Sequence, residues 1–213
     1  MADAPDALTR SHWYQRSGWR PGRQFYTWHV IDFITEPPIS EIVNSYAPEL
    51  FAAGVFDLVP ARWLHTTTQG VSFADTISES EAHAIVEAAR PLLAAAEPIS
   101  ATLGPIDMDA EAAFLPIRPF DQLEVVRTQI RTAIGQVRGA DQVPEPNRFG
   151  WPPHISLGYV NVSGKPLAPL RDVIRHDART WSVTINEIAL IKLSSDQHLY
   201  RWTTVGRPAR IGP

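Results

Sequence analysis

The sequence predicts an α+β fold for this chain of 213 residues. Hydrophobic residues make up 44% of the chain, which is typical of a globular protein with a substantial core. Predicted strands and helices alternate in the order β-α-β-α-ββ-α-β-α-ββ, without the regular units of a doubly wound parallel sheet. The sequence contains no GxGxxG, Walker A, GxSxG or HExxH motif, so it gives no sign of NAD, ATP or zinc use.

The first half of the chain contains two predicted strands and two predicted helices. Residues 24–34 are β-branched and aromatic, which predicts a buried strand. Apolar residues at helical spacing predict a helix over 39–53, in which Pro48 is a point where the helix could end early. Residues 61–71 predict a second strand. A second helix is expected after Ser78, with a kink where Pro91 interrupts it.

The second half continues the alternation. Residues 98–119 contain two short extended segments around a Gly-Pro pair, which predicts a hairpin or strand pair. Asp121 is expected to cap a helix whose apolar residues recur at spacings of three and four and which ends at Gly139. The remaining predicted elements are a strand at 154–162, a short helix at 167–177, and two strands at 182–195 and 199–211 joined through Asp196 and Gln197.

Composition excludes several classes of protein and partner. The chain has no cysteine, which excludes a disulfide scaffold, a thiolate zinc site, an iron–sulfur cluster and a cysteine nucleophile. No apolar stretch is long enough to span a membrane, and residues 1–19 lack the apolar core of a secretory signal, so we expect a cytoplasmic protein without a membrane partner. The net charge of −4 argues against binding of a large DNA duplex.

The charge is distributed unevenly along the chain. Residues 1–25 carry +2 and residues 171–213 carry +3, whereas residues 26–170 carry −9. If the two ends meet in space, they form a modest positive face that suits a small anionic ligand or a short RNA end. The alternative is a solvated surface whose asymmetry has no function.

Residues 1–23 predict an N-terminal arm in front of one domain that spans 24–213. The arm is irregular in pattern and interleaves basic and aromatic side chains, namely His12, Trp13, Tyr14, Arg16, Trp19, Arg20 and Arg23. Such a composition is typical of a surface that stacks bases and contacts phosphates of single-stranded nucleic acid. The alternative, slightly favoured, is an ordered arm that covers a sheet edge.

Two of the predicted strands contain a related motif. His65 and Thr67 stand two residues apart in one strand, and His154 and Ser156 repeat this spacing in another. Because residues i and i+2 of a strand share a face, each histidine is expected to point the same way as its hydroxyl partner. The opposite face of the second strand is apolar and suits a core, with Ile155, Leu157 and Tyr159.

These motifs resemble those of the 2H phosphoesterase superfamily, which includes 2′-5′ RNA ligase-like and cyclic phosphodiesterase proteins. The resemblance covers roughly residues 24–206. The segment 153–157, Pro-His-Ile-Ser-Leu, matches the family motif fully, whereas 65–68, His-Thr-Thr-Thr, departs at Thr68, where the family usually has an apolar residue. The resemblance implies a bilobal, pseudo-twofold fold in which two mainly antiparallel sheets, with helices outside, flank a central cleft.

The resemblance also implies a chemistry. His65 and His154 would act as general acid and base in cleaving a 2′,3′-cyclic phosphate or a 2′-5′ linkage, while Thr67 and Ser156 bind the phosphate. Imidazole suits both roles because it titrates near neutral pH. We therefore expect a monomeric, metal-independent phosphodiesterase without a cofactor, whose partner is a small nucleotide or the cyclic phosphate end of an RNA. The alternatives are a non-catalytic RNA-end or nucleotide-binding module in the same cleft and, more weakly, a metal-dependent hydrolase.

Other candidate residues leave two interpretations open. His29, on the first predicted strand, either faces the cleft or packs in the core, and packing is favoured. Trp151 either offers a platform for a base or anchors the loop before His154. His83 is expected to be exposed on a helix with acidic neighbours, whereas His176 and His198 lie near loops without convincing partners. No spacing among the histidines supports a zinc site.

Overall fold

A computed structural model describes residues 7–13, 17–94, 96–144, 151–174 and 177–208. These residues form four α-helices, namely α1 (Ile39–Ala53), α2 (Glu79–Leu93), α3 (Asp121–Arg138) and α4 (Leu167–Ile174). They also form nine strands, namely β1 (Phe25–Thr35), β2 (Phe56–Leu58), β3 (Thr66–Phe73), β4 (Ile99–Leu103), β5 (Asp107–Met108), β6 (Ala112–Arg118), β7 (His154–Val160), β8 (Trp181–Ser194) and β9 (Arg201–Gly206).

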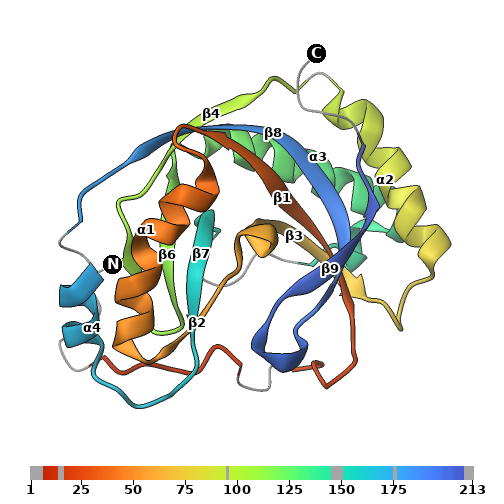
Figure 1. The fold of residues 1–213 in the computed structure, drawn as a ribbon. Helices are drawn as coiled ribbons and strands as arrows, with labels where there is room; N and C mark the ends of the chain where they lie inside the picture. The colour runs from red at the N-terminus through yellow and green to blue at the C-terminus, as the bar shows by residue number, and fades with distance from the viewer. Residues whose placement is uncertain (1–6, 14–16, 95, 145–150, 175–176, 209–213) are drawn as a thin grey trace.

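The strands form one continuous antiparallel path in the order β2-β7-β6-β4-β8-β1-β3, with β5 added to β6 and β9 added to β8. Strand β6 joins its two halves, because residues 112–116 pair with β7 while residues 117–118 pair with β4. The two predicted antiparallel sheets are therefore the two halves of one continuous open sheet. In Figure 1, β2, β6 and β7 lie in one half, and β1, β3, β8 and β9 lie in the other.

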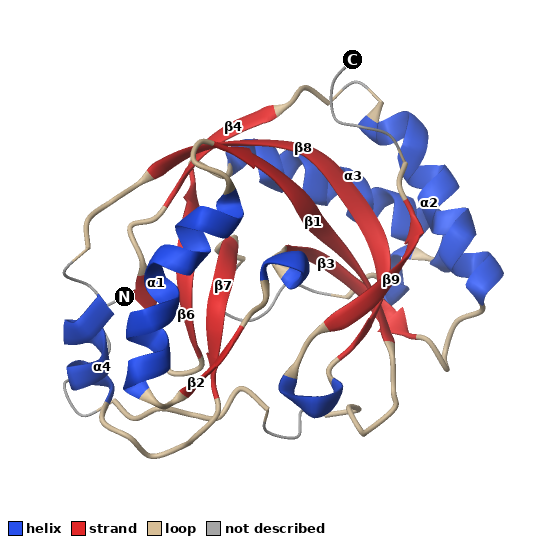
Figure 2. Cartoon of the chain, in the orientation of Figure 1, coloured by secondary structure: helices blue, strands red, loops and turns tan. Residues whose placement is uncertain are grey.

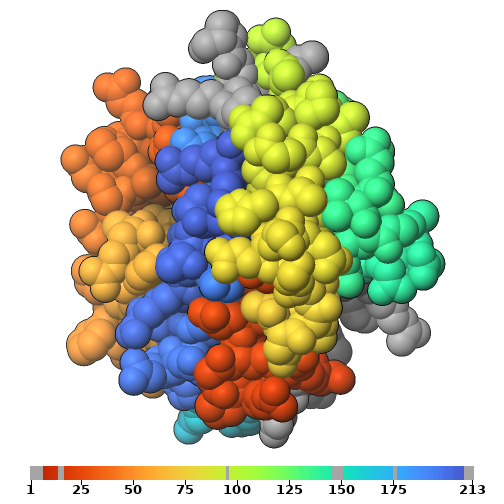
Figure 3. Space-filling view, turned by 90° about the vertical axis from the view of Figure 1, so that its right-hand side faces the viewer, coloured from red at the N-terminus to blue at the C-terminus, as the bar shows by residue number. Residues whose placement is uncertain are grey.

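The helices lie outside the strands, two against each half. Helices α1 and α4 pack together beside β2 and β7, whereas α2 and α3 pack together beside β3 and β9 (Figure 2). Figure 3 shows the outer face of the second half, where α2 runs alongside β9. Among the described residues, no helix combines the length and the apolar character that crossing a bilayer requires.

Local signals explain why helix α2 begins where it does. It starts with a capping box, in which the hydroxyl of Ser78 accepts the backbone N–H of Glu81 and the Glu81 carboxylate returns to the backbone of Ser78. Its buried face consists of residues at helical spacing, and Pro91 lies inside the helix without ending it. The cap and the apolar period are both local patterns that the sequence already displays.

The predicted helix over 39–53 is confirmed, whereas one expectation about a helix cap was wrong. Pro48 does not end α1, which continues to Ala53. Pro48 is exposed, so the helix loses one hydrogen bond on its solvent side and keeps its buried face. Asp121 is the first residue of α3 rather than its cap, a position occupied by Phe120. A carboxylate in the first turn still stabilises the positive end of the helix dipole.

The strand boundaries also differ from the prediction at several points. Ala61–Trp63 form a turn of 3₁₀-helix, and β3 begins only at Thr66, so His65 immediately precedes the strand instead of lying within it. The predicted strands 154–162 and 199–211 are shorter in the structure, which gives His154–Val160 and Arg201–Gly206. The short strands β2 and β5 were not predicted. Strand β2 pairs with β7, about a hundred residues further along the chain, whereas β5 has only two residues and pairs with the nearby β6.

Candidate functional site

The two histidine motifs meet in the structure although they lie far apart in the sequence. The hydroxyl of Thr66 donates a hydrogen bond of 2.9 Å to the backbone carbonyl of His154, 88 residues further along the chain. The indole Nε1–H of Trp151 donates a second bond, of 2.7 Å, to the carbonyl of Thr67. These two bonds tie the start of β3 to the segment that leads into β7. For Trp151, the geometry supports the interpretation as an anchor.

The two imidazole rings are held in the same way. The Nδ1 atom of His65 lies 2.8 Å from the carbonyl oxygen of Trp63, and the Nδ1 atom of His154 lies 2.9 Å from that of Pro152. A carbonyl only accepts, so Nδ1–H is the donor in both rings. In the neutral ring Nε2 then carries the lone pair and is the nitrogen that can take up a proton.

The surroundings of the two histidines differ. His65 is only 7% exposed, whereas His154 is half-buried and packs 5.0 Å, between ring centroids, from Phe114. Burial lowers the pKa of His65 to about 4, against the opposing effect of the bond to Trp63, and the charges of His154 and His12 lower it further. The ring of His65 is therefore neutral at pH 7.

Aromatic rings surround His65 on several sides. The ring of His29 stacks on it, with centroids 4.4 Å apart and planes inclined by 2°. Trp202 presents its edge at 5.3 Å and Tyr200 at 6.0 Å. His29 is buried, as the packing interpretation expected, and its Nε2 atom also lies 3.1 Å from the hydroxyl of Thr67. The structure therefore supports the packing interpretation of His29.

The two hydroxyl residues of the motifs occupy different environments. Thr67 is exposed, whereas its neighbours Thr66 and Thr68 are buried, as expected for three successive residues of a strand. Ser156 is buried and lies opposite Phe114 in the β6–β7 register. The expected core face of β7 is confirmed, since its three apolar residues are buried: Ile155, Leu157 and Tyr159.

The N-terminal arm brings a further histidine to this region. The backbone N–H of His12 bonds to the carbonyl of Val160, at the end of β7. The ring of His12 stacks on Tyr159, with centroids 4.1 Å apart, and its Nε2 lies 2.8 Å from the hydroxyl of Tyr200. Because His12 affects the pKa of His65, it belongs to the same electrostatic environment. Its only sequence signal was membership of the aromatic and basic arm.

The other described residues of the arm are largely engaged in packing. The guanidinium groups of Arg20 and Arg23 both bond to Asp75, and Arg23 also lies over the ring of Phe73. The indole of Trp13 donates to Asp57. These contacts favour an ordered arm over a free basic surface. The expectations for Tyr14, Arg16 and His176 fall outside the described residues.

Two cavities are candidates for ligand binding. A cavity of about 640 Å³ is lined by residues that include His12, Trp19, Arg20, His198 and Tyr200, and by no residue of either motif. His198 stacks on Trp13, with centroids 5.2 Å apart, and pairs with Asp57.

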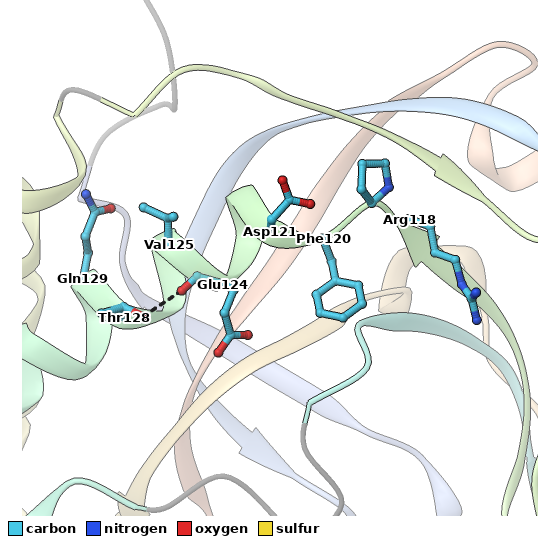
Figure 4. A pocket seen from close by; sticks show the side chains of 8 residues that line it. Arg118, Phe120, Asp121, Glu124, Val125, Thr128 and Gln129 are labelled. Carbon is cyan, nitrogen blue, oxygen red and sulfur yellow. Dashed lines mark hydrogen bonds between the residues drawn. The ribbon is translucent and has the colours of Figure 1, made fainter. Parts of the chain in front are cut away.

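The second cavity, of about 990 Å³, runs from the end of β6 to the first turns of α3 and includes no residue of either motif (Figure 4). Within the described ranges, no group of three or more His, Asp or Glu side chains is placed to hold a metal ion.

An antiparallel α+β fold with two His-x-[Thr/Ser] motifs joined by a hydrogen bond defines the class that the sequence resembles, the 2H phosphoesterases. Comparison with family models gives the particular family. The model of the 2′-5′ RNA ligase superfamily matches residues 35–197, and this chain belongs to that family.

Solved structures share the fold at low sequence identity. The protein TT0787 of Thermus thermophilus is 14% identical, with a TM-score of 0.64 over 89% of this chain and 97% of that one. LigT of E. coli, solved in complex with 3′-AMP, is 19% identical, with a TM-score of 0.62 over 87% of this chain and 97% of that one. A search of the curated proteins found no match.

Proposed function

We propose that this protein is a phosphodiesterase that hydrolyses 2′,3′-cyclic phosphates or 2′-5′ linkages of RNA or small nucleotides. One observation carries the proposal: both motifs are hydrogen-bonded to each other, and each presents a histidine whose Nδ1 is fixed by a backbone carbonyl. This arrangement leaves two Nε2 atoms available, as acid–base catalysis at one phosphorus requires. Membership of the 2′-5′ RNA ligase superfamily supports the reaction class.

The different surroundings of the two rings suggest their roles. His65, neutral because of its burial, takes a proton at Nε2 from the attacking water. The water oxygen forms a bond to phosphorus, and the bond from phosphorus to the ribose oxygen breaks. His154 gives its proton to that leaving oxygen, and proton exchange with solvent then restores both rings. Thr67 and Ser156 donate hydrogen bonds to non-bridging oxygens, which orients the phosphate and stabilises the charge that develops on it.

Small nucleotides are the substrate class that the comparisons favour. LigT of E. coli has been solved in complex with 3′-AMP, NADP+, ATP and phosphate. In this chain, the cavity beside His12 and Tyr200 has a volume of about 640 Å³, within the usual range for small-molecule sites. Its aromatic lining suits a nucleobase. We propose that it receives the nucleoside of the substrate, and that no resident cofactor is needed.

Hydrolysis of 2′,3′-cyclic nucleotides in the presence of EDTA tests the proposal. Replacing either His65 or His154 by Ala is expected to lower kcat/KM by roughly 10²–10⁴-fold, the usual contribution of a general acid or base. His83→Ala is the matched control, because His83 is exposed on α2, where it pairs with Glu79.

Three outcomes would contradict parts of this proposal. Full activity of either motif variant would remove that histidine from the mechanism. Loss of wild-type activity in EDTA would indicate a metal-dependent hydrolase. Binding of the cyclic nucleotide without turnover would replace the enzyme by a nucleotide- or RNA-end-binding module.

A further inference from the structure

We propose that His29 is a positioning residue, which directs the hydroxyl proton of Thr67 away from the protein interior and holds the plane of the His65 ring. The proposal rests on the proposed function for its catalytic consequence. It adds to the two motifs a third histidine from a different strand, β1, which faces Thr67 directly in the β1–β3 register. Three observations support it. His29 is hydrogen-bonded to Thr67, its ring stacks on that of His65, and its buried Nδ1 has no partner among the described residues.

The hydrogen bond between His29 and Thr67 has only one favourable direction. His29 is 1% exposed, and its Nε2 lies 3.1 Å from the Thr67 hydroxyl oxygen. Its Nδ1 is also buried and has no hydrogen-bond partner within the part of the chain that the structure describes. A neutral imidazole carries one N–H, and a buried N–H without an acceptor is rarer in proteins than an under-used acceptor. The proton of His29 therefore resides on Nε2, from which it is donated to Thr67.

This assignment decides what the Thr67 hydroxyl can do. If His29 donates, the oxygen of Thr67 is the acceptor and its own proton is free to be donated elsewhere. Because Thr67 is exposed, that proton can reach a phosphate oxygen in solvent-accessible space. If His29 accepted instead, the Thr67 hydroxyl would donate its proton to His29 and could not donate it to phosphate. His29 thus converts Thr67 into a donor.

A charged His29 would carry a proton on both ring nitrogens, and Nδ1–H would then be a buried donor without an acceptor among the described residues. Burial lowers its pKa well below the ordinary value, and the charge of His65 lowers it further. The other groups packed against it are Thr67 from β3, the edge of Trp202 from β9 at 5.9 Å, and Ala189 from β8. None of these three is a charged side chain, so none of them offsets the lowered pKa, and His29 is neutral at pH 7.

The stacking contact acts on His65. The two rings are parallel within 2°, and the edge of Trp202 contacts both of them. Together with the bond from Nδ1 to the Trp63 carbonyl, these contacts fix both the tilt and the rotation of the His65 ring. The direction of the Nε2 lone pair of His65 is therefore set by its contacts with His29 and Trp202 as well as by the bond to Trp63.

Two variants separate the hydrogen bond from the stacking. His29→Phe keeps a flat ring and removes the donor, whereas His29→Gln keeps an N–H donor and removes the stacking ring. The readout is the Kd of inorganic phosphate, measured by titration calorimetry without turnover. We expect His29→Phe to weaken phosphate binding by up to about tenfold, because the Thr67 hydroxyl loses the bond that orients it although its proton stays free, and His29→Gln to restore most of the affinity.

A double-mutant cycle with Thr67→Val tests whether His29 acts through Thr67. In the Thr67→Val background, His29→Phe is expected to leave phosphate binding unchanged. An equal tenfold loss in both backgrounds would overturn the proposal. A catalytic comparison adds the stacking role: His29→Gln is expected to lower kcat while KM stays near the wild-type value, and an unchanged kcat would remove that role.

A spectroscopic test uses the wild-type protein alone. Two-bond ¹⁵N–¹H correlation spectra report which ring nitrogen of a histidine carries the proton. We expect His29 to show a protonated Nε2 and a bare Nδ1, and the opposite tautomer would overturn the proposal even if every variant failed to fold. Because the tautomer and phosphate binding are measured without turnover, a protein that passes both tests and hydrolyses no cyclic nucleotide would refute the proposed function only.

Discussion

Replacing Thr66 and Thr68 each by Val is expected to change stability in opposite directions. Both side chains are buried on the same face of β3, with 0% and 1% exposure. They differ in their hydroxyls: that of Thr66 donates to the carbonyl of His154, whereas that of Thr68 has no partner among the described residues. The substitution keeps shape and volume almost constant, so it isolates the hydroxyl group.

The magnitudes follow from the cost of a buried polar group. Thr66→Val removes a hydrogen bond and leaves a carbonyl unpaired, which lowers the free energy of unfolding by about 1–2 kcal/mol. Thr68→Val removes an unsatisfied hydroxyl and raises the free energy of unfolding by about 1 kcal/mol. In a domain of this size, each kcal/mol shifts Tm by about 2–4 °C.

Urea unfolding with a constant m value provides the measurement. Thr203→Val on the exposed face of β9 is the matched control, and we expect it to stay within about 0.5 kcal/mol of the wild type. A loss of stability in Thr68→Val comparable to that in Thr66→Val would refute the reasoning, because the hydroxyl at 68 would then have a partner. The apolar residue that the family usually has at this position is consistent with the expected gain.

Three further predictions concern stability. The pKa of His65 is about 4 in the folded state against 6.5 unfolded, so its contribution to stability is full above pH 6.5 and falls as the pH drops toward 4. The contribution lost at pH 5 is about 2 kcal/mol, and urea melts of the wild type and of His65→Phe at pH 7 and 5 isolate it, where an equal pH dependence in both proteins would contradict it. Trp151→Phe removes the bond to the Thr67 carbonyl and lowers the free energy of unfolding by about 1 kcal/mol, where no change in urea melts would contradict the anchoring role. Gly104→Ala places a Cβ at a φ of +86° and 2.9 Å from the Arg179 carbonyl, which costs at least about 1–2 kcal/mol, and a wild-type Tm would contradict it.

The sequence predicts the long elements well because their signals are local. The capping box at Ser78 and the apolar period of α3 lie within single helices, and both are present in the structure. Pro48 shows where a local rule fails. Burial of Leu50 on the inner face of α1 outweighs one lost hydrogen bond on the outer face. Strand β2 pairs with residues about a hundred positions away, so no local pattern predicts it.

The candidate site is predictable in part for the same reason. The spacing of the four motif residues is a local pattern, but their meeting depends on the side chain of Thr66 and on Trp151. His29 illustrates the limit: a strand histidine in an apolar run favours the core, and only the β1–β3 register brings it opposite Thr67. His12 reaches the site through backbone pairing of the arm, which carries no side-chain signal.

The backbone bond to Trp63 raises the pKa of His65, so the lowered pKa of this histidine must come from its burial and its neighbours. Under the proposed mechanism, the burial that lowers the pKa of His65 to about 4 makes it the base, and environments that separate two titratable groups commonly assign such roles. Protonation of the base abolishes activity, so a lowered pKa extends activity to lower pH.

The acid limb of kcat/KM, which reports the free enzyme, should therefore lie near pH 4. At pH 5, a base with this pKa stays about 90% neutral, whereas one with the ordinary value of 6.5 would be only about 3% neutral. Rates measured with cyclic nucleotide from pH 4.5 to 8, with folding checked by circular dichroism at each point, distinguish the two cases. An acid limb near pH 6.5 would show that the group whose protonation stops the reaction has an ordinary histidine pKa. His65 would then not be the base.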